Sequence, residues 1–140
     1  MRGSAICLLV LSLFVWVGFA AAQGTEREKA GTAAAGKWLA LVDSGNYGQS
    51  WKEAAQYFRD AVTEAKWAQT LEQVRDPLGK LVSREVKSAV NKTSLPGAPD
   101  GEYVLIEFQA SFENKKSAIE TVTSMLEKDG TWRIAGYFIK

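Results

Sequence analysis

The residues that could perform chemistry in this sequence are few. The chain has no histidine and a single cysteine, Cys7, which excludes Ser-His-Asp and Cys-His catalysis and removes the commonest metal ligand. An enzyme would need a buried carboxylate of raised pKa with a hydrogen-bond donor beside it. Glu107 and Glu120 are the candidate acids, and Tyr103 or Tyr137 the candidate donor. Because a solvated sheet face explains Glu107 without any chemistry, we assign no catalytic residue. No acidic metal-binding loop is present, and we expect no cofactor.

A second set of residues could form a binding site. Aromatic side chains with one convergent cation suit a small amphipathic or anionic ligand. We expect such a site at the mouth between helices and sheet, formed by Tyr47, Trp51, Tyr57, Trp67 and Arg75. The alternative is that the tryptophans belong to the core, because they follow the apolar stripe of a helix, and that Arg75 only balances a helix C-terminus.

The third candidate is a loop rich in proline and glycine. Prolines restrict its backbone, so it can present side chains to a protein partner at low entropic cost. The expected partner-binding residues are Leu95, Pro96, Gly97, Pro99 and Asp100. The alternative is a structural crossover that joins two strands and covers an open sheet edge.

Three helices are predicted to position these residues. A capping-box pattern opens the first helix, from about Glu26 to Asp43. A second capping box at Ser50 opens the second helix, whose apolar stripe is Trp51, Ala54, Ala55, Phe58 and Val62. The third helix is capped by Thr63 and ends near Arg75, because Pro77 restricts the residue before it to extended geometry.

After Gly79 the apolar period changes from 3.6 to 2 residues, which predicts four strands. Their ranges are 81–93, 103–112, 117–128 and 132–140, with an Asp129-Gly130 hairpin turn before the last. The first strand should have one wet face, with three valines alternating with polar residues: Val82, Val86 and Val90. The second places five apolar residues on one face: Val104, Ile106, Phe108, Ala110 and Phe112. The expected fold is α+β, with the helices packed on a curved, cone-like antiparallel sheet.

Residues 1–22 are predicted to be a secretory signal peptide. Arg2 gives a basic start, residues 6–19 form an apolar run too short for a membrane span, and Ala20-Ala21-Ala22 precede a cut before Gln23. An uncut membrane anchor is the alternative. We expect an exported protein, periplasmic or secreted, with residues 23–140 as one α+β domain free of the membrane after cleavage. The chain has 17 basic and 16 acidic residues, and Arg2 leaves with the leader, so a neutral mature chain argues against nucleic-acid binding.

Several segments resemble one family of secreted bacterial proteins, known as domain of unknown function 4019. They are Trp38 to Tyr47 with Ser50-Trp51, Arg75 to Gly79, Thr93 to Phe112, Glu120 to Thr123, Gly130 to Trp132 and Gly136 to Ile139. The resemblance covers about residues 33–140 and brings no established catalytic residues. More distantly, the order of elements is similar to the cone-shaped superfamily of nuclear transport factor 2 and ketosteroid isomerase, which implies a fold but no function.

The sequence thus predicts an exported, non-catalytic module that binds a small ligand or a protein partner. Two alternatives stay open. One is a cofactor-independent cone enzyme, an isomerase or hydrolase that uses a cavity carboxylate. The other is a structural envelope module that forms a homodimer through the open face of its sheet.

Overall fold

The computed structural model describes residues 15–140, with side chains from Gly24 onward. The elements are α1 (Val15–Asp43), α2 (Tyr47–Lys52), α3 (Gln56–Ala61), α4 (Glu64–Val74), a short 3-10 helix η1 (Asp76–Leu78), β1 (Leu81–Lys92), β2 (Tyr103–Phe112), β3 (Lys115–Leu126) and β4 (Trp132–Ile139). The predicted α+β order of helices followed by strands is confirmed. The predicted signal peptide lies outside the described residues, apart from the backbone of residues 15–22 at the start of α1. Among the described helices, none is both long and apolar enough to cross a membrane.

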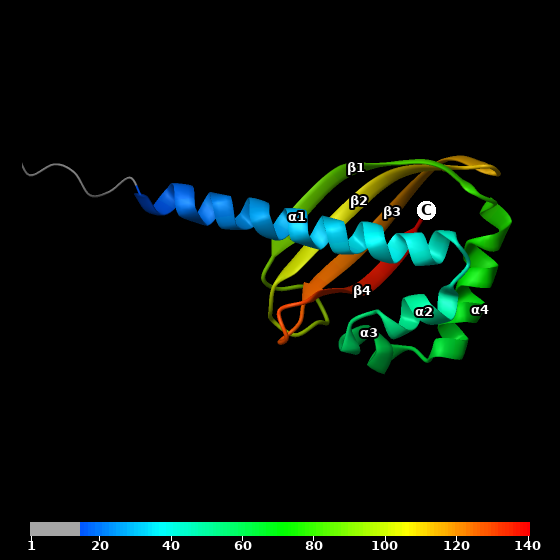
Figure 1. The fold of residues 1–140 in the computed structure, drawn as a ribbon, viewed down its shortest axis with the longest axis horizontal. Helices are drawn as coiled ribbons and strands as arrows, with labels where there is room; N and C mark the ends of the chain where they lie inside the picture. Colours follow the sequence, from blue (N-terminus) through cyan, green and yellow to red (C-terminus); the bar gives the residue numbers. More distant parts are fainter. Residues whose placement is uncertain (1–14) are drawn as a thin grey trace, which may run out of the picture.

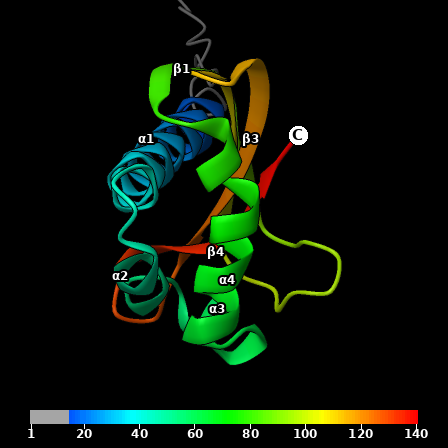
Figure 2. The same cartoon turned by 90° about the vertical axis from the view of Figure 1, so that its right-hand side faces the viewer.

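The strands form an open antiparallel sheet in the order β1-β2-β3-β4, which leaves β1 and β4 at its edges. The helices lie on one side of this sheet, and α1 crosses it obliquely (Figures 1 and 2). The face of β2 that the sequence assigns to the core is confirmed, since all five of its apolar residues are buried: Val104, Ile106, Phe108, Ala110 and Phe112.

The core lies between α1, α4 and the inner face of the sheet. It includes Trp38, Leu39, Val42, Trp67, Leu71, Val104, Ile106, Phe108, Val122 and Ile134. Gly31 brings α1 close to β2, because a Cβ at this position would lie 2.7 Å from the Val104 Cβ. The buried Ser124 hydroxyl donates to the Gly31 carbonyl at 2.7 Å, which adds a bond from β3 to the same point of α1. The closest helix–sheet contact therefore needs the smallest residue.

The helix predictions are confirmed only in part. The first helix ends at Asp43 as expected, but it begins before the capping box and runs through Thr25. The predicted second helix is wrong, since the chain forms two short helices, α2 and α3, in its place. Ser50 does not cap a helix but lies buried inside α2. The break between α2 and α3 follows from a tertiary contact, in which the Ala55 N–H donates to the Ile134 carbonyl of β4 at 2.8 Å. An amide committed to the sheet is no longer free to continue a helix.

The C-terminal boundary of α4 and its cap agree with the sequence. The Thr63 hydroxyl accepts the Lys66 N–H at 3.2 Å, as an N-cap does, and α4 ends at Val74. Pro77 lies in the 3-10 turn that follows. These features are local, so the sequence pattern is sufficient to predict them.

The predicted dry face of β1 is wrong. Val82, Val86 and Val90 are exposed by 65%, 50% and 44%. Two register shifts, one after Leu81 and one after Val86, break the strict alternation that the prediction assumed. Because β1 is also an edge strand, its valines can remain exposed while the polar Arg84 points inward.

Candidate functional site

Four charged side chains and one tyrosine form a network between the helices and the sheet. They come from five elements: Asp43 ends α1, Arg75 follows α4, Arg84 lies on β1, Glu120 on β3 and Tyr137 on β4. Arg84 contacts both acids, with Nη1–Asp43 Oδ2 and Nε–Glu120 Oε1 distances of 2.7 Å each. Arg75 Nη2 lies 2.8 Å from Asp43 Oδ1, and the Tyr137 hydroxyl donates to Glu120 Oε2 at 2.5 Å. The two acids and two arginines balance in charge.

Burial and the neighbouring charges shift the pKa values of several side chains in this network. Burial alone would raise the pKa of Asp43, but hydrogen bonds from Arg84 and Arg75 outweigh it and hold that pKa below its usual value of 3.8. The pKa of the Tyr137 hydroxyl is raised by burial and by the negative charge of Glu120. Burial opposes the charge of Arg84, yet its hydrogen bonds to Asp43 and Glu120 raise its pKa. Asp43 and Arg84 therefore stay charged and Tyr137 stays neutral at neutral pH.

The candidate catalytic acids have different surroundings. Glu120 is 0% exposed, and both its carboxylate oxygens already accept hydrogen bonds, from Arg84 and Tyr137. Glu107 pairs across the sheet with Thr121 and Ser88, away from this network. Of the candidate donors, only Tyr137 meets a candidate acid. In β3, Glu120 lies on the same face as the buried Val122 and Ser124, because alternate residues of a strand point to the same side. This alternation is the sequence signal from which the burial of Glu120 could have been predicted.

The expected ligand residues are not gathered around one mouth. The Trp67 indole donates to the Ser50 hydroxyl at 3.0 Å, and the Trp51 indole donates to the Val62 carbonyl at 2.7 Å, so both have structural partners. The Tyr47 hydroxyl donates to Asp76, and burial with this bond raises its pKa to about 12. Tyr47 and Arg75 line a shallow pocket of about 340 Å³, whereas Trp67 lines a separate slot of about 190 Å³.

The expected partner-binding loop, residues 93–102, stands out from the sheet on the side opposite α1 (Figure 2). Two tyrosine hydroxyls fasten it from different elements. Tyr57 of α3 donates to the Gly97 carbonyl at 2.8 Å, and Tyr103 of β2 donates to the Pro99 carbonyl at 2.5 Å. Within the loop Leu95 is half-buried, and the other expected contact residues are exposed: Pro96, Gly97, Pro99 and Asp100. The loop is therefore anchored while its tip stays accessible.

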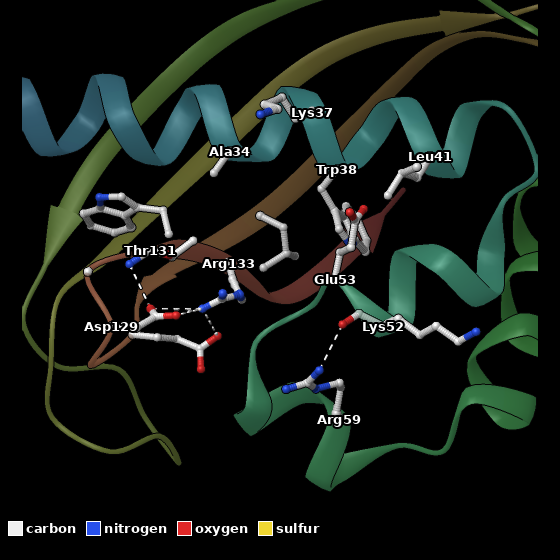
Figure 3. A pocket seen from close by; sticks show the side chains of 14 residues that line it. Ala34, Lys37, Trp38, Leu41, Lys52, Glu53, Arg59, Asp129, Thr131 and Arg133 are labelled. Atoms are coloured by element: carbon white, nitrogen blue, oxygen red, sulfur yellow. Dashed lines mark hydrogen bonds and ion pairs between the residues drawn. The ribbon is translucent and has the colours of Figure 1, made fainter.

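A large groove, which the sequence did not predict, opens beside α1. It has a volume of about 1090 Å³ and lies between α1, the α2–α3 segment and the turn before β4 (Figure 3). Its apolar lining includes Ala34, Trp38, Leu41, Trp132 and Ile134. None of the five expected ligand residues lines it. The Asp129-Gly130 turn at one end was predicted locally, but only the fold brings that turn opposite α1 and α3.

Some charged side chains of the groove are paired with an opposite charge, and others are not. Arg133 is held by Asp129 and Glu127, with shortest distances of 2.9 and 3.3 Å (Figure 3). Arg59 donates to the Lys52 carbonyl at 2.9 Å but faces no carboxylate within bonding distance in the described part of the chain. Within those described residues, the Glu53 carboxylate also has no hydrogen-bond or ion-pair partner. The groove thus offers a cation and an anion that are not neutralised by each other.

Acidic side chains do not assemble into a metal site in the part of the chain with described positions. No group of three or more His, Cys, Asp or Glu residues there could hold a metal ion.

Together these features define a class of α+β protein with helices on one face of an open four-stranded sheet, an ion network between the layers and an open groove beside them. The chain belongs to the protein family of unknown function DUF4019, whose model matches residues 34–137. The match runs from the middle of α1 into β4 and confirms the family resemblance seen in the sequence. A comparison with curated proteins finds no significant match.

Proposed function

We propose that this protein is an exported, non-catalytic binding module whose ligand occupies the groove between α1, the α2–α3 segment and the turn before β4. The observation that carries the proposal is the groove itself, with a volume of about 1090 Å³ and a lining of apolar and charged residues. A cavity of this kind suits a small amphipathic ligand, since apolar area supplies affinity and a few polar groups fix orientation.

The wall of the groove supports this ligand class. Ala34 and Leu41 of α1 and Trp132 of β4 give it an apolar surface, since these three lining residues are only half-buried. Arg59 and Glu53 stand on the α2–α3 side of the same cavity, and each is able to contact a polar group of a ligand (Figure 3). A ligand with one apolar part and one polar or charged part would satisfy both kinds of surface.

The surroundings of Glu120 argue against the alternative of a cavity enzyme. A general acid or base must come within about 3 Å of the proton that it transfers. Glu120 is fully buried, its two oxygens are engaged, and it is absent from the lining of the groove. We therefore assign Glu120 a structural role.

The test is a titration with an amphipathic probe, 1-anilinonaphthalene-8-sulfonate, followed by amide chemical shifts. The expected shifts cluster on the groove residues. Ala34→Leu places extra bulk inside the groove and should weaken binding by about tenfold or more, which corresponds to about 1.4 kcal/mol. Ala40→Leu is the matched control, because Ala40 is exposed on the same helix and does not line the groove.

Shifts that concentrate away from the groove, or equal affinity of wild type and Ala34→Leu, would contradict the proposal. A neutral amphiphile, octyl glucoside below its micelle concentration, separates apolar binding from attraction to the probe's sulfonate. Loss of shifts for this second probe alone would limit the ligand class to anions.

Export and a distant relation to the nuclear transport factor 2 superfamily are part of the same proposal. The basic start, apolar run and small residues of the leader support export, and the helices-then-meander order supports the relation. The intact mass of the protein recovered from a periplasmic fraction should correspond to a chain that begins at Gln23. Recovery of the full-length chain from the membrane would contradict export with cleavage.

A further inference from the structure

The two edges of the sheet differ in how well they are protected. Exposed edge strands usually carry charges, bulges or prolines that prevent pairing with another chain. β1 has two register shifts and several charged residues: Arg84, Glu85, Lys87 and Lys92. β4 has one register shift, at Ala135, but no charged residue and no proline from Ile134 to Ile139, where the sequence is Ile-Ala-Gly-Tyr-Phe-Ile. The β4 edge is therefore open to pairing on sequence grounds.

The hydrogen-bond pattern shows which backbone groups of β4 are free. Lys140 and Ile119 exchange both backbone hydrogen bonds, at 2.9 and 3.0 Å, so the polar groups of Lys140 face β3. Since these pairs alternate along an antiparallel ladder, Phe138 also faces β3, whereas the N–H and C=O of Tyr137 and Ile139 point away from it. At Ile134 the edge is closed, because its carbonyl accepts the Ala55 N–H at 2.8 Å. The open and regular part of the edge is residues 136–139, on the C-terminal side of the register shift at Ala135.

The side chains beside this open edge are apolar on both faces of the sheet. Phe138 lies on the outer face and is 61% exposed. On the inner face a slot of about 190 Å³ separates α4 from β4, with Leu71, Val74 and Tyr137 in its lining. Val74 at the rim of the slot is 38% exposed. A strand added to this edge would find apolar contacts above and below it.

We propose that a second copy of the chain adds to this edge, with β4 pairing antiparallel to β4 around a twofold axis at Phe138. In this register Tyr137 of each copy exchanges N–H···O bonds with Ile139 of the other, which gives four bonds. Phe138 then faces Phe138 on the outer side of the combined sheet. Ile139 of each copy, on the inner side, lies opposite Tyr137 of its neighbour, beside the slot between α4 and β4. The inference is independent of the proposed ligand groove.

The charges and the backbone of this edge favour a second copy over an unrelated chain. A twofold axis places identical residues together, so any charge near the axis would meet its own sign. Ile134 to Ile139 contain no charged residue, which removes that repulsion. Lys140 would lie opposite Gly136, whose missing side chain leaves room for the lysine stem. The β1 edge fails this condition, since its charged residues would be brought near their own copies.

The area of contact sets the expected strength of the dimer. A pairing of about five residues per copy buries less than the ~800 Å² per partner of a standard interface. The dimer should therefore be weak, with the average mass rising between about 10 µM and 1 mM in sedimentation equilibrium.

A backbone variant tests the register directly. Ile139→Pro removes an N–H that has no partner within the sheet of one chain, so it should abolish the rise in mass while leaving the fold intact. Ile139→Ala is the matched control, because it keeps the N–H and should still dimerise, although more weakly. Val86→Ser, at a half-exposed valine of the other edge, should leave dimerisation unchanged.

A crosslinking variant tests the position of the axis. Directly opposed residues of a non-hydrogen-bonded pair have Cα atoms about 4.5 Å apart, within the range that a disulfide spans. In a Cys7→Ser background, Phe138→Cys should crosslink to a covalent dimer under mild oxidation, and Val86→Cys should not. A chain that stays monomeric to about 1 mM, a dimer that persists in Ile139→Pro, or a Phe138→Cys variant that does not crosslink would each overturn the inference.

Discussion

Asp43 and Glu120 are held in place by two arginines, and this arrangement explains how charges are tolerated between the layers. Each acid accepts hydrogen bonds from Arg84, and Arg75 closes the network from the end of α4 while its guanidinium stacks 4.7 Å from the centre of the Phe112 ring. A buried pair contributes little net stability compared with apolar residues, but removing one partner leaves the other charge buried alone. The network therefore specifies how the elements dock more than it adds to stability.

Glu120→Gln should destabilise the protein by about 3 kcal/mol, because the buried charge of Arg84 loses one of its two acidic partners. Urea unfolding followed by tryptophan fluorescence measures the change. Glu107→Gln, in the neighbouring strand but outside the network, should change stability by less than about 0.5 kcal/mol. Equal effects of the two substitutions would show that Glu120 is not held as described.

The lowered pKa of Asp43 predicts that the free energy of unfolding depends on pH in the acid range. Its pKa is lower in the folded chain than the value of 3.8 expected when unfolded, so the unfolded chain takes up the proton first as the pH falls. Its contribution is therefore fully present above about pH 5 and is lost as the pH drops through 3.8 toward the folded pKa. The stability difference between wild type and Asp43→Asn should be constant from pH 5 to 7 and shrink below pH 4. A difference that grows in acid would contradict this sign.

At the scale of elements, the position of α1 decides the arrangement of the others. It contacts the sheet across β1 to β4 and ends at the ion network, while one flank forms a wall of the groove. Its close approach to β2 depends on the absence of a side chain at Gly31. The loop of residues 93–102 is positioned in a different way, by hydroxyls of Tyr57 and Tyr103 that come from a helix and a strand.

Two glycines of α1 should respond in opposite directions to the same substitution. Gly31→Ala places a methyl group against Val104 and should destabilise the protein by about 1–2 kcal/mol, after the gain in helix propensity. Gly36→Ala meets no atom within 4 Å and should stabilise it by about 0.5–1 kcal/mol. Thermal unfolding by circular dichroism measures both. A stabilising Gly31→Ala would mean that α1 does not approach β2 this closely.

For the whole molecule, the helices cover one face of the sheet and leave its edges and outer face for other uses. The groove opens beside α1 and is lined in part by Trp132 to Ile134 of β4. The anchored loop stands on the side of the sheet opposite α1 (Figure 2), and the open part of the β4 edge is formed by other residues, 136–139. Ligand binding in the groove and dimerisation at β4 can therefore be tested independently. A variant that blocks one surface should leave the other intact.

Features whose causes lie within a few residues could be predicted from the sequence alone. The Thr63 cap, the end of α1 at Asp43, the Asp129-Gly130 turn and the buried face of β2 follow from local hydrogen bonds and from periods of 3.6 and 2. The family could also be recognised from the sequence, because its characteristic segments occur in order along the chain.

Features that depend on partners far along the chain could be seen only in the folded protein. The break between α2 and α3 needs Ile134, the burial of Glu120 needs Arg84 and Tyr137, and the exposure of the β1 valines follows from bulges at a sheet edge. The groove likewise joins α1 to a turn about 90 residues further along. A local pattern shows which residues are apolar or charged, but it does not show which distant residue each of them will contact. The candidate site is formed by such long-range contacts.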